Sequence, residues 1–167
     1  MNRISLTELR KCLSKVKLLA LDIDGVLTDG GLYYTETGEE LKKFNVKDGM
    51  GIKQVMQAGI QVAIITTSNS SSVLHRAKKL GISHVFLGAE DKLSILEDLC
   101  LQLQLSMEQV AYIGDDINDL PVLQAVGCPI TVADAMPQNL ELAAYITHKP
   151  GGHGAVREVC DRLLKIQ

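Results

Sequence analysis

Short apolar runs alternate along this chain with stretches whose apolar residues recur at helical spacing. The runs predict five buried strands and a weaker sixth. They are Lys17–Ile23, Gln61–Thr66, His84–Leu87, Val110–Ile113, Pro129–Val132 and, more weakly, Tyr145–Thr147. Most are continuous apolar runs without in-out alternation, which is expected for strands that are covered on both faces.

Amphipathic segments between and after these runs predict helices. Ser71–Leu80 and Asp91–Leu103 each place apolar residues on one stripe, and Gly81 provides a C-terminal stop for the first. The glycines of 151–154 predict a flexible loop before a last helix, Ala155–Ile166. Strands that alternate with helices favour right-handed crossovers. The predicted fold is therefore α/β, a three-layer, doubly wound parallel sheet.

One segment breaks this alternation soon after the first strand. Residues 30–46 predict a β-hairpin with strands Leu32–Thr35 and Glu40–Phe44 around Thr37-Gly38. The hairpin is more apolar than a solvated one needs to be. Its apolar residues are Leu32, Tyr33, Tyr34, Leu41 and Phe44. They indicate either burial at an interface or packing of one face on the protein's own sheet.

Length and composition bound the function. The 167 residues fit one domain, 1–167, and the net charge of −3 offers no basic stripe for nucleic acid or an anionic membrane. No apolar run approaches the roughly 18 residues of a membrane span, and residues 1–14 do not look like a signal peptide. Four scattered cysteines without a C-x-x-C pair indicate reduced thiols. We therefore expect a cytoplasmic protein that binds neither nucleic acid nor membrane.

Acidic residues gather directly after two of the predicted strands. The first strand runs into Asp22-Ile23-Asp24-Gly25, where Gly25 permits a turn that lets both carboxylates converge. The fourth runs into Gly114-Asp115-Asp116-Ile117-Asn118-Asp119. An Asx-turn or a helix N-terminus explains one or two of these acids, but not two clusters on adjacent strands. Such clusters repel each other unless a cation lies between them, and carboxylates without His or Cys suit Mg²⁺.

Two other strand ends carry groups that suit phosphate. Thr66 ends the second predicted strand, and Thr67–Ser72 opens the next helix with hydroxyls and free N–H groups. A plain N-cap is the alternative interpretation of this serine-rich segment. Lys92 stands at a helix start, where the macrodipole disfavours a cation, and lysine is a common phosphate ligand. Together the strand ends are typical of phosphoryl transfer to an aspartate.

These residues, in this order, resemble the four motifs of the haloacid dehalogenase superfamily of phosphatases. The motif residues are Asp22-x-Asp24-Gly-Val-x-Thr28, Thr66, Lys92 and Gly114-Asp115-Asp116-x-x-Asp119. Further segments resemble one capless family within it, the 3-deoxy-D-manno-octulosonate 8-phosphate phosphatases. They are Asp24–Gly30, Gly38–Lys42, Phe44–Gly49, Gly114–Pro121 and Gly151–Glu158, and the resemblance covers roughly residues 16–164.

The resemblance implies the Rossmann-like haloacid dehalogenase fold and an enzyme, a phosphoric monoester hydrolase of bacterial surface-polysaccharide (lipopolysaccharide) sugar biosynthesis. Asp22 would attack phosphorus and become a transient aspartyl phosphate. Asp24 would protonate the leaving sugar oxygen and then activate the hydrolytic water. Thr66 would donate to a phosphate oxygen, and Lys92 would pair with both the phosphate and the nucleophile.

The same resemblance implies a magnesium site. The ligands would be the Asp22 carboxylate, the Asp24 backbone carbonyl and Asp115. Asp116 and Asp119 would lie behind them and orient the ligands. The cation would offset the repulsion between an anionic nucleophile and a phosphate dianion.

No cap domain is expected over this site. Only 44 positions separate Asp22 from Thr66 and 26 separate Thr66 from Lys92, which leaves no room for a cap in either interval. In the resembled family the hairpin packs into a homotetramer, and a neighbouring subunit helps to close each site. The resemblance therefore implies a homotetramer for this chain.

The family's sugar contacts carry over to eight positions. They are Asn45, Val46, Lys47, Asp48, Gly49, Lys53, Ser68 and Arg76. Thr67-Ser68 replaces the family's Gly-Arg pair, and Lys53 stands where Arg is common. Neither residue reproduces the bidentate arginine fork on a sugar carboxylate. The implied small-molecule substrate is a 2-keto-3-deoxy sugar acid phosphate, with the octulosonate favoured over a nine-carbon nonulosonate 9-phosphate.

Other protein classes fit these residues less well. A signalling receiver domain would carry its phosphorylated aspartate after the third strand, where Phe86-Leu87-Gly88 stands. A dinucleotide-binding protein would need a G-x-G-x-x-G motif after a strand, and none is present. A catalytically weak binding or regulatory relative is the remaining alternative. It is suggested by Ser68 and Lys53, although every residue assigned to the chemistry is present.

Overall fold

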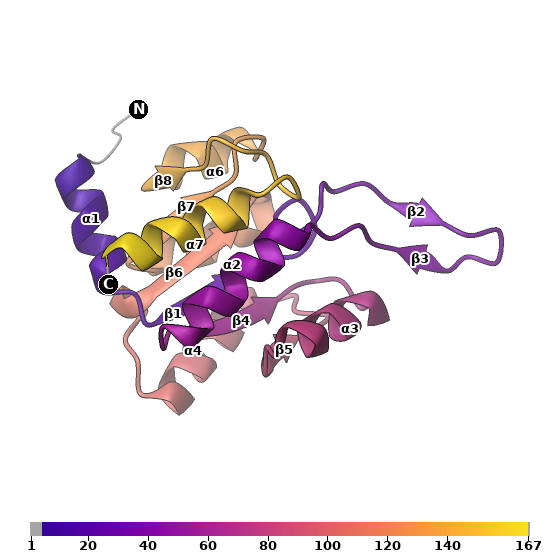
Figure 1. Ribbon diagram of the computed structural model, residues 1–167, viewed down its shortest axis with the longest axis horizontal. Coiled ribbons are helices and arrows are strands. Elements are labelled where there is room, and N and C mark those ends of the chain that lie inside the picture. Colours follow the sequence, from indigo (N-terminus) through magenta and orange to yellow (C-terminus); the bar gives the residue numbers. More distant parts are fainter. Residues whose placement is uncertain (1–4, 167) are drawn as a thin grey trace.

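The computed structural model describes residues 5–166 as a parallel six-stranded sheet between helices (Figure 1). The strand order is β5-β4-β1-β6-β7-β8, and every pairing in this sheet is parallel. The strands are β1 (Leu18–Leu21), β4 (Gln61–Ile65), β5 (His84–Phe86), β6 (Val110–Gly114), β7 (Cys128–Thr131) and β8 (Tyr145–Ile146). The predicted doubly wound parallel sheet is confirmed, and all six predicted strands are present.

Helices cover both faces of the sheet and create two separate cores. One core collects apolar residues of α1, α2, α3 and α7, and the other collects those of α4 and α5. The helices are α1 (Leu6–Ser14), α2 (Val46–Gln57), α3 (Ser71–Leu80), α4 (Lys92–Leu103), α5 (Leu120–Ala125), α6 (Pro137–Leu142) and α7 (Ala155–Ile166), with 3₁₀ turns η1 (Met107–Gln109) and η2 (Ile117–Asp119).

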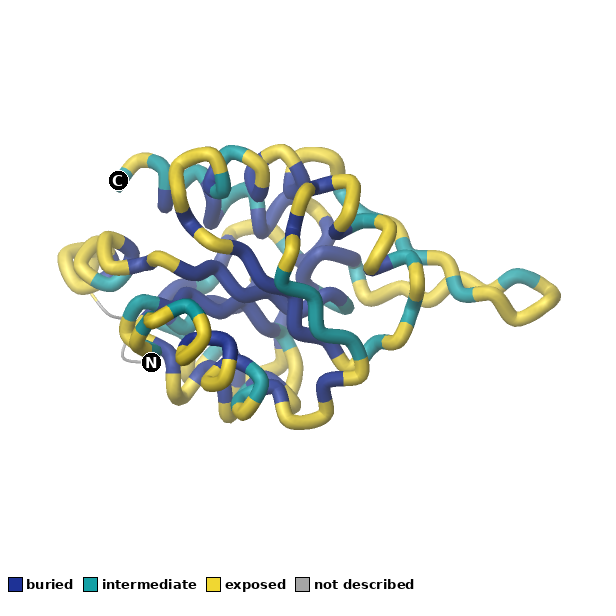
Figure 2. The backbone as a smooth tube through the Cα atoms, turned by 90° about the horizontal axis from the view of Figure 1, so that it is seen from below, coloured by how far each residue is buried: buried dark blue, intermediate teal, exposed yellow. Residues whose placement is uncertain are grey.

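The continuous apolar runs of the central strands follow from this double coverage. In β1, Leu19 and Leu21 face the core of α2 and α7, whereas Leu18 and Ala20 face the core of α4 and α5. Successive residues of a strand point to opposite faces, and helices cover both faces, so all four side chains are fully buried. Figure 2 shows the resulting buried centre of the molecule.

Helix ends agree with the local sequence where it carries strong signals. Gly81 adopts φ 84° after α3, as the predicted C-terminal stop requires. The side chain of Asp91 accepts a hydrogen bond from Ser94 N at the start of α4. The four helices α1, α2, α5 and α6 were not predicted from the pattern of apolar positions.

The hairpin forms its own two-stranded antiparallel sheet of β2 (Tyr33–Tyr34) and β3 (Glu40–Leu41). It projects from the body of the molecule (Figure 1), so packing on the protein's own sheet is wrong for four of its five apolar residues, whereas Phe44 packs against the core. Both strands are shorter than the predicted Leu32–Thr35 and Glu40–Phe44. Its apolar residues Leu32, Tyr33, Tyr34 and Leu41 are 49–61% exposed.

The structure shows no cap domain among the described residues. The hairpin and α2 occupy the interval between Asp22 and Thr66, and α3 and β5 occupy the interval between Thr66 and Lys92. In residues 5–166, no helix is both long enough and apolar enough to cross a membrane. Among the described residues, no domain therefore covers the carboxyl ends of the strands.

Candidate active site

Three neighbouring strands bring the predicted motif residues together. The central strand β1 pairs with β4 on one side and β6 on the other, so Leu21 lies opposite both Ile64 and Ile113. Because the strands are parallel, the residues that follow them meet at one edge of the sheet. Asp22, Thr66 and the Asp115 loop therefore lie at the same end, as the sequence predicts.

The chain turns sharply after Asp22. Ile23 N donates to Asp22 Oδ1 at 2.7 Å, and Gly25 adopts φ 78°. A Cβ atom at Gly25 would lie 1.9 Å from Asp115 Oδ2, so only glycine allows the two loops to approach this closely. The turn places Asp24 beside Asp22 without extending the strand.

A buried ammonium group joins the acidic residues of two strand ends. Lys92 Nζ lies 2.8 Å from Asp22 Oδ2 and 2.7 Å from Asp119 Oδ1, and its side chain is fully buried. Burial alone would lower the pKa of Lys92, but Asp22 and Asp119 raise it above its usual value. The group stays charged because two carboxylates replace its lost hydration.

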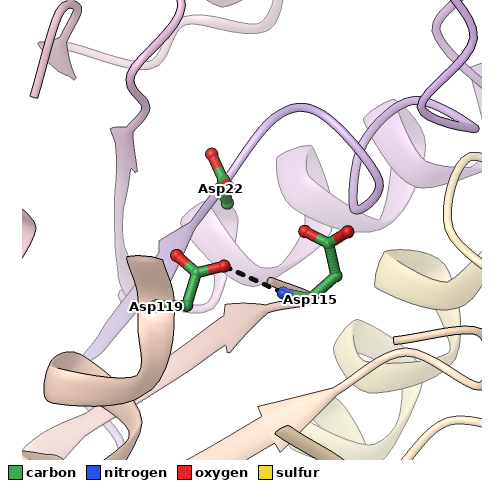
Figure 3. A group of neighbouring side chains, drawn as sticks. All are labelled: Asp22, Asp115 and Asp119. Atoms are coloured by element: carbon green, nitrogen blue, oxygen red, sulfur yellow. Dashed lines mark hydrogen bonds between the residues drawn. The ribbon is translucent and has the colours of Figure 1, made fainter. Parts of the chain in front are cut away.

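Asp119 anchors the loop that carries Asp115. Its Oδ1 accepts from Lys92 and, at 2.6 Å, from the buried Tyr112 hydroxyl. Its Oδ2 accepts from Asp115 N at 2.9 Å and from Asp116 N at 3.2 Å. Figure 3 shows Asp119 reaching back to the Asp115 backbone while the Asp115 carboxylate points away from Asp119. That carboxylate lies against the turn at Gly25.

The acidic residues leave a position that fits a hard divalent cation. Oxygens of Asp22, Asp115 and Asp119 lie within 4.8 Å of one another, and Asp115 Oδ1 is buried without a hydrogen-bond partner. Each Asp119 oxygen already accepts two hydrogen bonds. Each Asp22 oxygen has one partner and Asp115 Oδ1 has none, so Asp22 and Asp115 keep more capacity to bind a cation. A donor set of carboxylate oxygens suits Mg²⁺.

Burial and mutual repulsion keep these carboxyls difficult to ionise. Burial, followed by Asp22 and Asp119, raises the pKa of Asp115 to about 8. Burial and then Asp119 raise the pKa of Asp22 to about 6, despite the opposing effect of Lys92. An isolated cluster of this kind is destabilising near neutral pH, and a bound cation relieves it.

We expect a divalent cation to stabilise the protein more at about pH 8.5 than at about pH 5. Carboxyls with a raised pKa stabilise the metal-free fold at low pH, and this contribution is lost as the pH rises through about 6 and about 8. At the lower pH the cation must also displace protons. Thermal unfolding with and without MgCl₂ at both values measures the difference.

The matched variants for this experiment are Asp115→Asn and Asp98→Asn. The first removes the carboxylate with the unpaired oxygen and should abolish the stabilisation, whereas the second changes an exposed acid of α4 and should keep it. An equal rise in melting temperature at both pH values would contradict the prediction.

A hollow of about 300 Å³ opens above these groups. Its lining residues are Asp22, Asp24, Gly25, Gly30, Thr67, Asp115, Asp116 and Asn118. Thr66 is buried beneath it, and Ser68 N donates to Thr66 Oγ1 at 3.2 Å. Four of the eight lining residues are acids, so the hollow suits a small anion only together with a cation.

The eight predicted sugar contacts lie elsewhere in the single chain. None of them is among the residues that line the hollow. Val46, Lys47 and Lys53 are exposed along α2, whereas Asn45 caps its start. Ser68 lies beside Thr66 in the turn after β4. Their contact with a sugar stays a prediction.

Asp48 and Gly49 are buried, Arg76 is half-buried, and all three have close neighbours within the chain. Arg76 Nη2 donates to Asn45 O at 3.0 Å, and a Cβ atom at Gly49 would lie 2.3 Å from that same nitrogen. The Asp48 side chain is buried, and its Oδ1 accepts from Arg157 N at 2.8 Å. Asp48 therefore caps the N-terminus of α7 from a neighbouring helix and presents no surface to a ligand in the single chain.

The glycine run before α7 was expected to be a flexible loop, and that expectation is wrong. Gly151 and Gly152 are buried, and a Cβ atom at Gly151 would lie 1.7 Å from Gly25 O. Gly152 N donates to Val26 O at 3.0 Å, and Asn45 Nδ2 donates to Gly152 O at 3.1 Å. The run is a tight turn that supports the loop carrying Asp22 and Asp24.

Sequence reasoning gave Lys42 no role, although it lies in one of the segments that carry the resemblance. Lys42 Nζ lies 2.7 Å from Asp24 Oδ1 and 2.9 Å from Glu40 Oε1. Nothing in the spacing of the sequence pairs a hairpin lysine with an aspartate 18 positions earlier. The contact exists because the hairpin leaves and rejoins the body beside the Asp24 turn.

Comparisons with known proteins agree with these observations. The haloacid dehalogenase-like hydrolase family matches residues 50–127. The chain is 49% identical to the 3-deoxy-D-manno-octulosonate 8-phosphate phosphatase KdsC of Salmonella typhi over 152 residues, which cover 91% of this chain and 81% of that protein.

Solved structures are similar over nearly the whole chain. The octulosonate phosphatase of Moraxella catarrhalis, solved with magnesium, phosphate and KDO, is 44% identical with a TM-score of 0.96, over 98% of this chain and 94% of that one. The cobalt-bound phosphatase of Haemophilus influenzae is 42% identical with a TM-score of 0.90, over 93% and 91%.

Proposed function

This chain belongs to the 3-deoxy-D-manno-octulosonate 8-phosphate phosphatases, within the haloacid dehalogenase-like hydrolases, and we propose that it hydrolyses 3-deoxy-D-manno-octulosonate 8-phosphate. It is a phosphoric monoester hydrolase. The observation that carries the proposal is the ion pair of Asp22 with the buried Lys92 beside the unpaired Asp115 oxygen. We assign the reaction to the synthesis of lipopolysaccharide sugars.

Asp22 is the proposed nucleophile. Its Oδ1 accepts from Ile23 N and its Oδ2 pairs with Lys92, so the carboxylate is fixed in direction before substrate arrives. In-line attack on phosphorus would form an aspartyl phosphate and release the sugar alkoxide. Lys92 stabilises the charge that the nucleophile and the phosphoryl oxygens share.

Asp24 is the proposed proton carrier. It lines the hollow two residues after the nucleophile, on the turn that Gly25 makes possible. It would give its proton to the leaving sugar oxygen and afterwards take a proton from the water that hydrolyses the intermediate. Thr66 would donate to a phosphoryl oxygen from the base of the hollow.

The residues present fit a magnesium ion. Asp22, the Asp24 backbone carbonyl and Asp115 would hold it, and Asp116 and Asp119 would orient that set. When bound, the ion supplies positive charge that lets an anionic carboxylate approach a phosphate dianion. The unpaired Asp115 oxygen is the structural support for this assignment.

Phosphate release from a panel of sugar phosphates, with and without Mg²⁺, tests the proposed function. We expect the octulosonate 8-phosphate to be hydrolysed fastest and only with the cation present. Absence of release from every member, with Mg²⁺ bound as judged by thermal stabilisation, would overturn the proposal. That result would favour a catalytically weak binding or regulatory relative.

A nine-carbon nonulosonate 9-phosphate is the second candidate substrate, because Ser68 and Lys53 lack the arginine fork. We predict that Ser68→Arg moves the ratio of kcat/KM toward the octulosonate by about ten- to a hundredfold, the effect of one charged hydrogen bond of roughly 1.5–3 kcal/mol. Ser70→Arg, in the same turn, is the matched control. An unchanged ratio would contradict the role of Ser68.

We also propose that the chain works as a homotetramer assembled through its hairpins. Leu32, Tyr33, Tyr34 and Leu41 are exposed apolar residues of the hairpin, and Figure 2 shows the hairpin as a largely exposed projection from the body. Light scattering should give a mass of four chains, and Leu32→Glu should reduce it. A monomer at micromolar concentration would contradict the assembly.

A further inference from the structure

The side chain of Lys42 is almost completely covered, although it leaves an exposed hairpin. It is 2% exposed, and its ammonium group lies between Asp24 Oδ1 at 2.7 Å and Glu40 Oε1 at 2.9 Å. Burying an ammonium group is costly unless carboxylates replace its hydration. Burial alone would lower the pKa of Lys42, and these two partners raise it above the usual value.

Asp24 is held from two sides at the same oxygen. Lys42 and the buried Thr28 both donate to Oδ1, at 2.7 and 3.4 Å. The side chain of Asp24 is nevertheless 39% exposed and lines the hollow. Thr28 belongs to the same turn as Asp24, so Lys42 is the contact that reaches it from another element.

We infer that Lys42 is a positioning residue that fixes the Asp24 carboxyl over the reacting phosphate. The inference rests on the proposed function, in which Asp24 carries the proton. Because the site has no cap domain, the ammonium group that orients the Asp24 carboxyl comes from the hairpin. Tyr34 donates to Glu40 Oε2 at 3.3 Å, so Lys42 also connects Asp24 with the exposed apolar surface of the hairpin.

The chemistry of the leaving group separates this role from a general loss of structure. Protonation by Asp24 matters most for a sugar alkoxide, which is a poor leaving group, and little for p-nitrophenolate. The ratio kcat/KM reports the steps through release of the leaving group. A misplaced Asp24 therefore lowers kcat/KM for the sugar acid phosphate far more than for p-nitrophenyl phosphate.

Lys42→Met is the diagnostic variant, with Lys42→Arg as its conservative partner and Lys43→Met as the matched control. Lys43 is exposed and pairs with Asp29, outside the proposed machinery. We expect Lys42→Met to lower kcat/KM at least about tenfold more for the sugar acid phosphate than for p-nitrophenyl phosphate. Arginine should restore part of the loss, and Lys43→Met should change neither value.

Asp24→Asn and the double variant Asp24→Asn/Lys42→Met complete the experiment. If Lys42 acts only through Asp24, the double variant should be no less active than Asp24→Asn alone. Equal losses on both substrates, additive losses in the double variant, or full activity of Lys42→Met would overturn the inference while leaving the proposed function intact. An inactive wild-type protein would overturn both. Light scattering establishes that the variants keep the assembly.

A second inference rests on a different observation, a pair of cysteines far from the hollow. Cys12 of α1 and Cys128 of β7 are 116 positions apart, yet their Sγ atoms lie 2.7 Å from each other. Cys128 is fully buried, whereas Cys12 is partly exposed. Helix α1 packs against the core that it shares with α2, α3 and α7, chiefly through Leu9 and Leu13.

We propose that Cys12 and Cys128 are a peroxide-oxidisable pair that fastens α1 to the sheet. The Cys12 thiolate would attack a hydroperoxide, breaking its O–O bond to give a sulfenic acid and a hydroxide or alkoxide ion, which takes a proton from water. The Cys128 thiol would then displace water to form the disulfide. The hydrogen bond with Cys128 holds the pKa of Cys12 below its usual value, which favours Cys12 as the attacking sulfur.

Peptide mapping after hydrogen peroxide treatment, without reduction, tests this pair. We expect a linked peptide containing Cys12 and Cys128, an intact mass lower by two hydrogens, and a melting temperature higher by several degrees that dithiothreitol reverses. Cys12→Ser should abolish all three changes, whereas Cys100→Ser should keep them. Absence of the linked peptide in the oxidised wild-type protein would overturn the proposal.

Discussion

Replacing Asp22 with asparagine is expected to abolish phosphate release while leaving the fold intact. The variant keeps the volume of the side chain and an oxygen that accepts from Ile23 N, but it removes the nucleophile. Loss of a nucleophile lowers turnover by about 10⁴-fold or more. Phosphate release with Mg²⁺ present and circular dichroism of the same sample measure the two parts of this prediction.

Asp22→Asn is also expected to be at least as stable as the wild-type protein when no metal is bound. Burial and Asp119 raise the pKa of Asp22 to about 6, so ionising this carboxyl costs more in the folded metal-free protein than in the unfolded chain. Asparagine removes that charge, and Lys92 keeps Asp119 as its partner. The metal-free variant should therefore unfold no more readily than the wild-type protein. The control is Asp91→Asn, which preserves the N-cap of α4. Activity of Asp22→Asn within tenfold of the wild type would refute the role of Asp22 as the nucleophile.

The central strands and the strand-end residues could be predicted because one physical cause governs both. A strand covered on two faces must be apolar throughout, so β1, β4 and β6 stand out in the sequence. Parallel strands then bring whatever follows them to one edge. Asp22, Thr66 and Asp115 are adjacent for that reason, and no side-chain detail was needed to predict it.

Helix α2 could not be predicted, because its sequence contains two residues that disfavour helices. Gly49 and Gly51 each cost roughly 1 kcal/mol in a helix interior. Tertiary packing explains them: a Cβ atom at Gly51 would lie 2.9 Å from Arg157 Cδ and 3.0 Å from Cys160 Cβ. Gly51 allows α2 to approach α7 closely, Gly49 allows it to approach Arg76 of α3, and only the folded structure shows these neighbours.

The contacts that support the site were missed for a related reason. Lys42, Asp48 and Gly151 act on residues far away in the sequence, and no periodicity links them to their partners. The assignment of Asp48 to the substrate stays a prediction from the resemblance, and its contact with the start of α7 was not anticipated. Motif residues can be located from the ends of elements, whereas the residues that hold them in place depend on how the elements pack.

Lys92→Met should destabilise the metal-free protein by about 3–5 kcal/mol, the usual effect of removing one partner from a buried ion pair. The methionine fills the space of the lysine stem but leaves Asp22 and Asp119 facing each other without a counter-charge. For a domain of this size the loss corresponds to a melting temperature lower by roughly 6–20 °C. Chemical unfolding with and without Mg²⁺ measures it.

The cation and Lys92 neutralise the same carboxylates, so their contributions to stability should overlap. Mg²⁺ should therefore restore part of the stability that Lys92→Met loses, and stabilise the variant more than the wild-type protein. It should not restore activity, because kcat/KM also loses the charge beside the nucleophile, about 10²- to 10³-fold. Lys79→Met, on the exposed face of α3, should change stability by no more than about 0.5 kcal/mol. If Lys92→Met were as stable as this control without Mg²⁺, the buried lysine would not be what holds the two strand ends together.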